Sequence, residues 1–213
     1  MSSLFSGIRE TKPLQEITDI INALKVKVKL RTGEKNKRIL LTVDGKRQVL
    51  ILTQGYCKLV RQWDQRVSLT IHAPLIAGMG MPVDKENHLH VQAIDSIEYA
   101  LLPVDLFEQY IDEFNLWKQL AILSTWGLQA HNVYNKALAV NNNVKIATLL
   151  LNELNSEPDT IRCNITAQAY IQERTLLSRS WIMHFLSALK NEGHIELKRG
   201  ILTKINSLPG EPY

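Results

Sequence analysis

Apolar residues in the C-terminal third of the chain recur with helical spacing. Behind Ser178, the i, i+3, i+4, i+7 pattern of one buried helical face is formed by Ile182, Phe185, Leu186 and Leu189. Thr166 and Ser178 stand where a hydroxyl can accept a free backbone N–H at a helix start. Gly193 supplies the left-handed residue that commonly ends a helix. The pattern predicts a short helix, a tight turn and a longer helix.

A small basic hairpin follows these two helices. The apolar stretches 195–197 and 201–205 predict two strands, and the turn between them is Lys198-Arg199-Gly200, a cationic tip suited to a phosphate. Two helices and a basic hairpin are the layout of a winged helix-turn-helix, which we expect over residues 141–213. The alternative is an amphipathic helix followed by a hairpin in some α/β domain. The 12-residue step from Thr166 to Ser178 and the basic hairpin favour DNA binding.

The second helix of this motif is expected to enter the DNA major groove. Arg179 is the residue most suited to read a base, because its guanidinium matches O6 and N7 of guanine. The full set of predicted DNA-binding residues is Thr166, Gln168, Ser178, Arg179, Ser180, Trp181, Met183, His184, Ser187, Lys198 and Arg199.

Short apolar segments dominate the chain between residues 25 and 103. An amphipathic helix is predicted at 13–24, and strict alternation at 26–30 predicts the first strand. Asp44-Gly45 is a hairpin-turn signal. Many short strands with closely spaced turns are typical of a β-barrel or β-roll, and we assign residues 1–112 to that domain.

A long helical stretch begins at Pro103 and carries an apolar seam within the segment 113–140. The seam residues are spaced 4, 3, 4, 3, 4 and 3 apart, as in a coiled coil: Leu116, Leu120, Leu123, Gly127, Ala130, Tyr134 and Ala137. This spacing predicts a homodimer. The alternative is that the seam packs against the protein's own β-roll. Asn141-Asn142-Asn143 is the predicted hinge, because asparagine weakens a helix.

Several C-terminal motifs resemble the CRP/FNR superfamily of bacterial regulators. They are IT-x-Q at 165–168, SR at 178–179 and L-x-x-EGHIE at 189–196. The tail KRGILTKINSLPGEPY is similar to that of the enterobacterial IprA (YaiV) group, a divergent branch of that superfamily. The resemblance extends over nearly the whole chain and is strong from about Pro103 onward.

The resemblance implies an α+β fold with an N-terminal cyclic-nucleotide-binding-like β-roll, a long dimerisation helix and a C-terminal winged helix-turn-helix. It also implies a transcriptional regulator with a role in stress response. The expected partners are double-stranded DNA and a second copy of the chain, with RNA polymerase as a further partner.

The sequence departs from cyclic-nucleotide sensors at their ligand positions. Gly78 stands where those relatives carry the glutamate that holds the ribose, and Asn87 and His88 fall on their arginine-serine pair. A buried phosphate needs a charged partner or several donors. We therefore expect a regulator that does not use cyclic AMP.

No cofactor or metal is expected. A Cys₄ iron–sulfur cluster cannot be built from the two cysteines. His72, His88 and His90 lack further ligands that would complete a metal site. The chain shows no P-loop, GxGxxG motif or nucleophile elbow, so we expect no enzymatic activity.

The composition of the chain is compatible with a nucleic-acid-binding protein. The 213 residues carry a net charge of +4, which is compatible with a nucleic-acid partner. No signal peptide or membrane-length apolar run is present, so a soluble, cytoplasmic protein is expected. The alternative function is a ligand- or redox-responsive protein-interaction module with no DNA operator. Cys57, near Lys58 and Arg61, is its candidate redox sensor.

Overall fold

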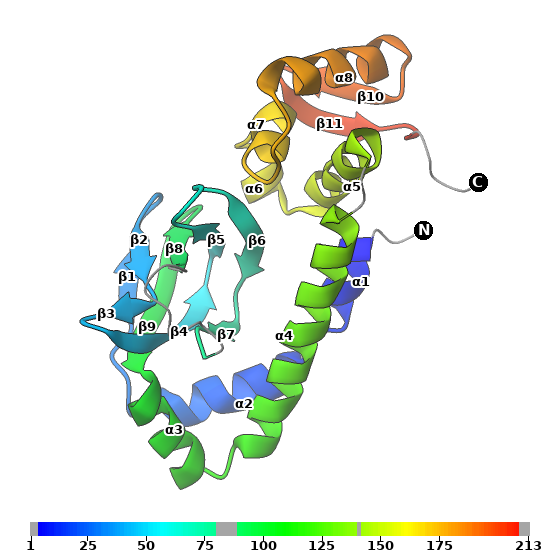
Figure 1. Cartoon of the computed structure of the whole chain (residues 1–213). Coiled ribbons are helices and arrows are strands. Elements are labelled where there is room, and N and C mark those ends of the chain that lie inside the picture. Colours follow the sequence, from blue (N-terminus) through cyan, green and yellow to red (C-terminus); the bar gives the residue numbers. More distant parts are fainter. Residues whose placement is uncertain (1–3, 80–88, 140–141, 209–213) are drawn as a thin grey trace. The chain divides into compact units, whose positions relative to one another are not determined.

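The computed structural model describes residues 4–79, 89–139 and 142–208 (Figure 1). The helices are α1 Leu4–Glu10, α2 Leu14–Leu24, α3 Val104–Glu113, α4 Trp117–Leu138, α5 Asn143–Ser156, α6 Asp159–Arg162, α7 Ala167–Gln172 and α8 Arg179–Asn191. The strands are β1 Arg31–Gly33, β2 Arg38–Leu40, β3 Thr42–Val43, β4 Lys46–Gln54, β5 Tyr56–Arg61, β6 Val67–His72, β7 Leu75–Ala77, β8 Leu89–Ala93, β9 Ile97–Pro103, β10 Ile195–Lys198 and β11 Ile201–Ile205.

The chain forms two compact units. The sheet unit comprises Lys12–Gly127, and the helix-turn-helix unit combines Met1–Thr11 with Leu128–Tyr213. This division differs from the predicted segments 1–112, 113–140 and 141–213 in two respects. The N-terminal helix α1 belongs with the C-terminal part of the chain, and α4 is shared between the two units.

The sheet unit contains two antiparallel sheets. One has the order β1-β9-β4-β3 with β7 also paired to β4, and the other has the order β2-β8-β5-β6. The centre of β4, residues 49–52, is a continuous apolar run because both faces of the strand are buried there. Leu50 and Leu52 point into the core between the sheets, whereas Val49 and Ile51 pack against helices. The predicted β-roll is confirmed.

Helices α2, α3 and the start of α4 cover the outer face of β4 and β9 (Figure 1). The buried face of α2 consists of Ile17, Ile20, Ile21 and Leu24. Phe107 and Ile111 of α3 lie in the same core. The asparagine at position 115 adopts a positive φ of 54° and separates α3 from α4, so the helical stretch after Pro103 is interrupted there.

The strand predicted at 26–30 is absent, and that prediction was wrong. Lys27 and Val28 donate their backbone N–H groups to the carbonyl of Leu24, at 2.9 and 3.1 Å. These two hydrogen bonds form a turn at the end of α2, so the N–H groups of Lys27 and Val28 cannot pair with a neighbouring strand. Val26 is 81% exposed, whereas Val28 and Leu30 are half-buried against the core, so the alternation marks a partly buried segment that pairs with no strand. The first strand begins at Arg31.

The first three seam residues are packed within a single chain. Leu116, Leu120 and Leu123 are buried in the core formed with α2, α3 and β4. Gly127 and Ala130 are half-buried, Tyr134 is buried, and the side chain of Ala137 lies outside the described residues. The predicted dimer contacts of these residues remain untested. Their burial shows that an apolar a/d pattern can serve an intramolecular core.

The helix-turn-helix unit has its own core. Side chains of α5, α7 and α8 pack against those of β10 and β11, with Tyr170 of α7 among the largest that are fully buried. Asn142 caps α5, since its side chain accepts from the backbone N–H of Lys145 at 3.0 Å. Figure 1 shows α1 beside α5, and the two helices are in contact.

Candidate nucleic-acid interface

Helix α8 has the buried and exposed faces that the sequence predicted. The Ser178 hydroxyl accepts from the backbone N–H of Trp181 at 3.2 Å and caps the helix start. Gly193 follows the helix with a φ of 76°. One face is buried in the core of the unit, and its residues are Ile182, Phe185, Leu186 and Leu189.

The opposite face of α8 is open to solvent. The predicted contacts on this exposed face are Arg179, Ser180, Met183, His184 and Ser187. Trp181 is half-buried, and its ring stacks on Phe185 with centroids 5.2 Å apart and an interplanar angle of 13°. The exposed face thus combines a guanidinium, hydroxyls, an imidazole and a thioether. Such groups can donate to, accept from and pack against base edges.

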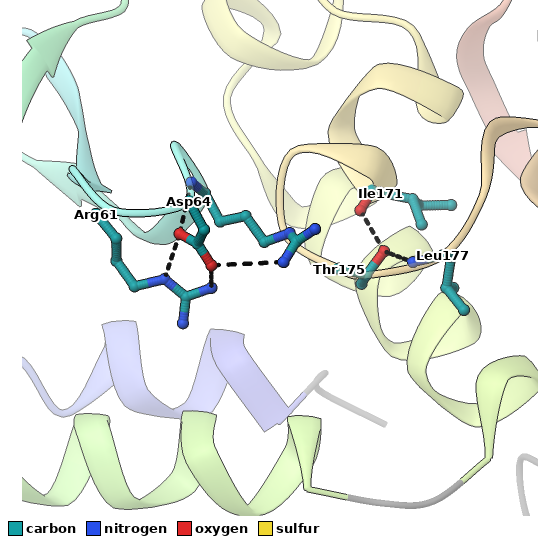
Figure 2. A network of polar contacts seen from close by, with 6 residues as sticks. Arg61, Asp64, Ile171, Thr175 and Leu177 are labelled. Atoms are coloured by element: carbon teal, nitrogen blue, oxygen red, sulfur yellow. Dashed lines mark hydrogen bonds and ion pairs between the residues drawn. The ribbon is translucent and has the colours of Figure 1, made fainter.

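A hydrogen-bonded turn sets the connection from α7 to α8. The buried Thr175 hydroxyl donates to the carbonyl of Ile171 at 2.9 Å and accepts from the N–H of Leu177 at 3.3 Å (Figure 2). Leu176, between Thr175 and Leu177, is 84% exposed and was not among the predicted contacts.

Figure 2 also draws an ion pair of the sheet unit, in which Nη2 of Arg61 lies 2.7 Å from Oδ2 of Asp64.

The hairpin of β10 and β11 is fastened to the start of α7. The N–H of Ala167 donates to the carbonyl of Gly200 at 2.8 Å. Arg199 and Gly200 form the turn with φ values of 51° and 82°, and Lys198 and Arg199 are exposed. Two cationic side chains therefore project from a tip whose backbone is tied to the helix-turn-helix.

Two predicted contacts on α7 have intramolecular roles. The Thr166 hydroxyl accepts from the N–H of Ala169 at 3.1 Å and caps α7. Gln168 donates its side-chain amide to Gln172. Both residues are half-buried. They can also meet the DNA backbone, a role that remains a prediction.

A buried polar cluster lies inside the helix-turn-helix unit and was missed by the sequence analysis. Arg9 of α1 donates to Glu157, which also accepts from the hydroxyl of Tyr170 at 3.3 Å. The guanidinium of Arg174 lies 3.5 Å from the centre of the Tyr170 ring. Glu153 completes the cluster, and only 3% of its surface is exposed.

The sequence carried one overlooked signal for this cluster. Glu153 and Glu157 follow Leu150 and Leu154 at i, i+3, i+4, i+7 spacing, so they lie on the buried stripe of α5 and its end. Burial raises the pKa of Glu153 to about 7, with Arg174 opposing the rise and the Glu157 charge adding to it. Two glutamates on an apolar helical stripe are thus a pattern from which buried ionisable groups could have been predicted.

Other candidate chemistry finds no site within the described residues. His90 is buried and accepts from Nε of Arg38 at 3.1 Å; burial and the Arg38 charge lower its pKa. Among residues whose placement is described, no three His, Cys, Asp or Glu side chains group as a metal site requires. Asn87 and His88, which the sequence analysis placed at the ligand positions of cyclic-nucleotide sensors, lie outside the described residues. In the described part of the chain, no helix is both long and apolar enough to span a membrane.

Cys57 is buried, and burial raises the pKa of its thiol to about 12, with Asp95 contributing. A reactive thiol needs exposure and a lowered pKa. The environment of Cys57 is that of a small core residue. Cys163 is exposed.

Comparison with known proteins agrees with this architecture. Residues 144–210 match the family model described as winged helix-turn-helix DNA binding. The chain is 27% identical to the Salmonella typhimurium protein called Inhibitor of hydrogen peroxide resistance over 204 residues, which cover 94% of this chain and 98% of the relative.

Two solved structures share the fold. The c-di-GMP responsive global regulator CLP of Xanthomonas campestris superposes with a TM-score of 0.71 and 11% identity, covering 89% of this chain and all of that one. A putative transcriptional regulator of the crp/fnr family from Eubacterium rectale gives a TM-score of 0.62 and 13% identity, covering 89% and 91%. The chain therefore carries a C-terminal winged helix-turn-helix domain, shares its fold with regulators of the crp/fnr family, and is similar over nearly its whole length to the proteins called Inhibitor of hydrogen peroxide resistance.

Proposed function

We propose that this protein is a sequence-specific regulator that reads duplex DNA with α8. The observation that supports the proposal is how α8 is placed within its unit. Its apolar face is buried, Arg179 begins its exposed face, and a cationic hairpin tip is tied to the preceding helix. The motif uses such a helix in the major groove, with phosphate contacts from neighbouring elements.

Selection of duplexes from a random pool, followed by binding measurements, tests this function. Arg179→Ala is expected to cost about 1–3 kcal/mol and to relax preference at one position of each half-site. Lys198→Ala is the matched control on the hairpin. It should weaken binding uniformly across sequences and reduce the salt dependence by about one phosphate contact. An Arg179→Ala variant that keeps the wild-type affinity and preference for the selected duplex would contradict the proposal.

The operator should differ from that of cyclic-nucleotide-dependent relatives. The notable positions on α8 are Ser180 and His184, which stand where those relatives carry a glutamate and an arginine. Both changes remove charge-assisted contacts to bases. Recovery of the relatives' consensus from the random pool would contradict this part of the proposal.

Regulation is proposed to be independent of cyclic AMP and of an iron–sulfur cluster. Gly78 has a φ of 106°, and a Cβ at this position would stand 2.3 Å from the carbonyl oxygen of Gln48. A glutamate therefore cannot replace it without moving β4. Calorimetric titration with cyclic AMP and cyclic GMP is expected to show no binding, and micromolar affinity would overturn the proposal.

The working unit is proposed to be a homodimer formed through α4. Two exposed apolar side chains on this helix are Ile122 and Leu128, whereas Leu120 already belongs to the core of one chain. Leu128→Glu is therefore the sharper variant, because Leu120→Glu would also disrupt the sheet unit. Sedimentation velocity should show a dimer for the wild type and a monomer for Leu128→Glu. A monomeric wild type that still binds a two-fold operator would contradict it. Contact with RNA polymerase stays a prediction.

The redox-responsive alternative is not favoured at Cys57. Its thiol is buried, and its raised pKa disfavours the reactive thiolate. No described feature specifically supports a protein-interaction module without a DNA operator.

A further inference from the structure

The N-terminal helix is joined to the DNA-binding unit by a buried ion pair. From α1, Arg9 donates through Nη2 to Oε1 of Glu157 at 2.8 Å and through Nη1 to the carbonyl of Ser156 at 2.9 Å. The Glu157 side chain is 0% exposed and that of Arg9 is 28% exposed. Arg9 lies far outside the segment 144–210 that matches the winged helix-turn-helix family. The ion pair therefore adds a distant element to that domain.

The same carboxylate oxygen leads onward to the helix-turn-helix. Oε1 of Glu157 also accepts from the hydroxyl of Tyr170, which is fully buried on α7. Arg174 donates through Nη1 to the carbonyl of Tyr170 at 3.1 Å and precedes the Thr175 turn that leads to α8. A continuous set of polar contacts thus runs from α1 to the connection between the two DNA-recognition helices.

We propose that Arg9 is a positioning residue for DNA recognition, and that α1 completes the DNA-binding unit by holding Glu157, and through it α7, in place. The inference rests on the proposed DNA-binding function. The chain passes between the two units twice: directly after α1, at Thr11 and Lys12, and again at residues 127–128.

Charge balance explains why Arg9 matters. The buried cluster that contains Glu157 holds ionisable groups from several elements: Tyr134 of α4, Glu153 of α5, Tyr170 of α7, and Glu173 and Arg174 after it. Without Arg9, the buried carboxyls of Glu153 and Glu157 face one buried guanidinium. A buried charge that loses its partner is strongly unfavourable, so either a carboxyl takes a proton or the helices move.

Arg9→Met in the full chain tests the proposal. Lys27→Met is the matched control, because it also removes one positive charge and one ion pair, the solvent-exposed pair with Glu113 at 2.7 Å. At pH 8, Arg9→Met should weaken affinity for the selected duplex about tenfold, within the usual range of coupling between sites. It should also speed hydrogen exchange of the α7 amides. Lys27→Met should leave both measurements near the wild-type values.

Two further measurements separate positioning by charge from packing by the arginine stem. The affinity deficit of Arg9→Met, relative to wild type at each pH, should shrink between pH 8 and pH 6 because protonation neutralises the buried carboxyls that face one positive charge fewer. Glu157→Gln in the Arg9→Met background should restore affinity, since an amide keeps an acceptor for Tyr170 and carries no charge. This double variant also keeps the test available if Arg9→Met alone folds poorly.

The outcomes distinguish this inference from the proposed function. A wild-type chain that selects no duplex overturns DNA reading and this inference together. A wild-type chain that binds, with Arg9→Met binding equally well, overturns the role of Arg9 alone. A deficit that neither pH nor Glu157→Gln relieves likewise overturns it, because that result assigns Arg9 a packing role. Relief by both supports the proposal.

Discussion

Replacing Glu153 with glutamine should change how the stability of the helix-turn-helix unit depends on pH. Glu153 lies on α5 with 3% of its surface exposed, and its Oε2 has no hydrogen-bond partner among the described residues. Burial raises its pKa from 4.5 to about 7, against the opposing charge of Arg174. The folded unit therefore prefers the protonated carboxyl, whereas the unfolded chain ionises at an ordinary pH.

The direction and size of the effect follow from this difference. A carboxyl with a raised folded-state pKa contributes its full stability below pH 4.5, and that contribution is lost as pH rises through about 7. Each pH unit between the two values corresponds to about 1.4 kcal/mol. The wild-type unit should thus lose on the order of 3 kcal/mol of unfolding free energy across this range, with most of the loss between pH 5 and pH 8.

Glu153→Gln removes the titrating group and should remove this loss. At pH 8 the variant should gain about 2–3 kcal/mol over wild type relative to their difference at pH 5. Trp181 is the only tryptophan at or after residue 128, so its fluorine resonance in 5-fluorotryptophan-labelled protein reports on this unit during urea unfolding. Glu108→Gln, at an exposed position of α3, is the control and should keep the wild-type pH dependence.

The reasoning would be refuted by parallel pH profiles for wild type and Glu153→Gln. Such a result would mean that Glu153 remains ionised in the folded unit near its ordinary pKa, so that Arg174 and Tyr170 outweigh burial. A constant offset between such parallel profiles would report only the exchange of a carboxylate for an amide.

Three further predictions concern caps, backbone and thiols. Ser178→Ala should destabilise the helix-turn-helix unit by about 1 kcal/mol through loss of the cap, measured by urea unfolding, whereas Ser187→Ala should not. Gly78→Ala should destabilise the sheet unit by about 2 kcal/mol or more, since its Cβ would meet Gln48; an unchanged thermal midpoint would contradict this. Iodoacetamide at pH 7.5 should modify Cys163 and spare Cys57 in folded protein, as read by mass spectrometry.

Local sequence determined much of the recognition motif. The hydroxyls of Thr166 and Ser178, the apolar spacing behind Ser178 and the glycine at 193 each act within a few residues of their own position. Caps and helical periodicity depend on neighbours in the chain, so they can be predicted without tertiary contacts. The same holds for the turn at Asp44 and Gly45, whose φ values of 50° and 74° fit the expected hairpin.

Tertiary structure decided which apolar and charged side chains are buried. The seam pattern did not reveal that Leu120 packs inside the core of the sheet unit, because a heptad pattern identifies an apolar face but not its partner. The alternation at 26–30 did not reveal that the end of α2 takes the backbone donors. Arg9 and Glu157 are 148 positions apart, so no local pattern linked them. They pair only because folding brings distant segments of the chain together. The charge of a buried carboxyl such as Glu153 likewise depends on side chains from several of these segments.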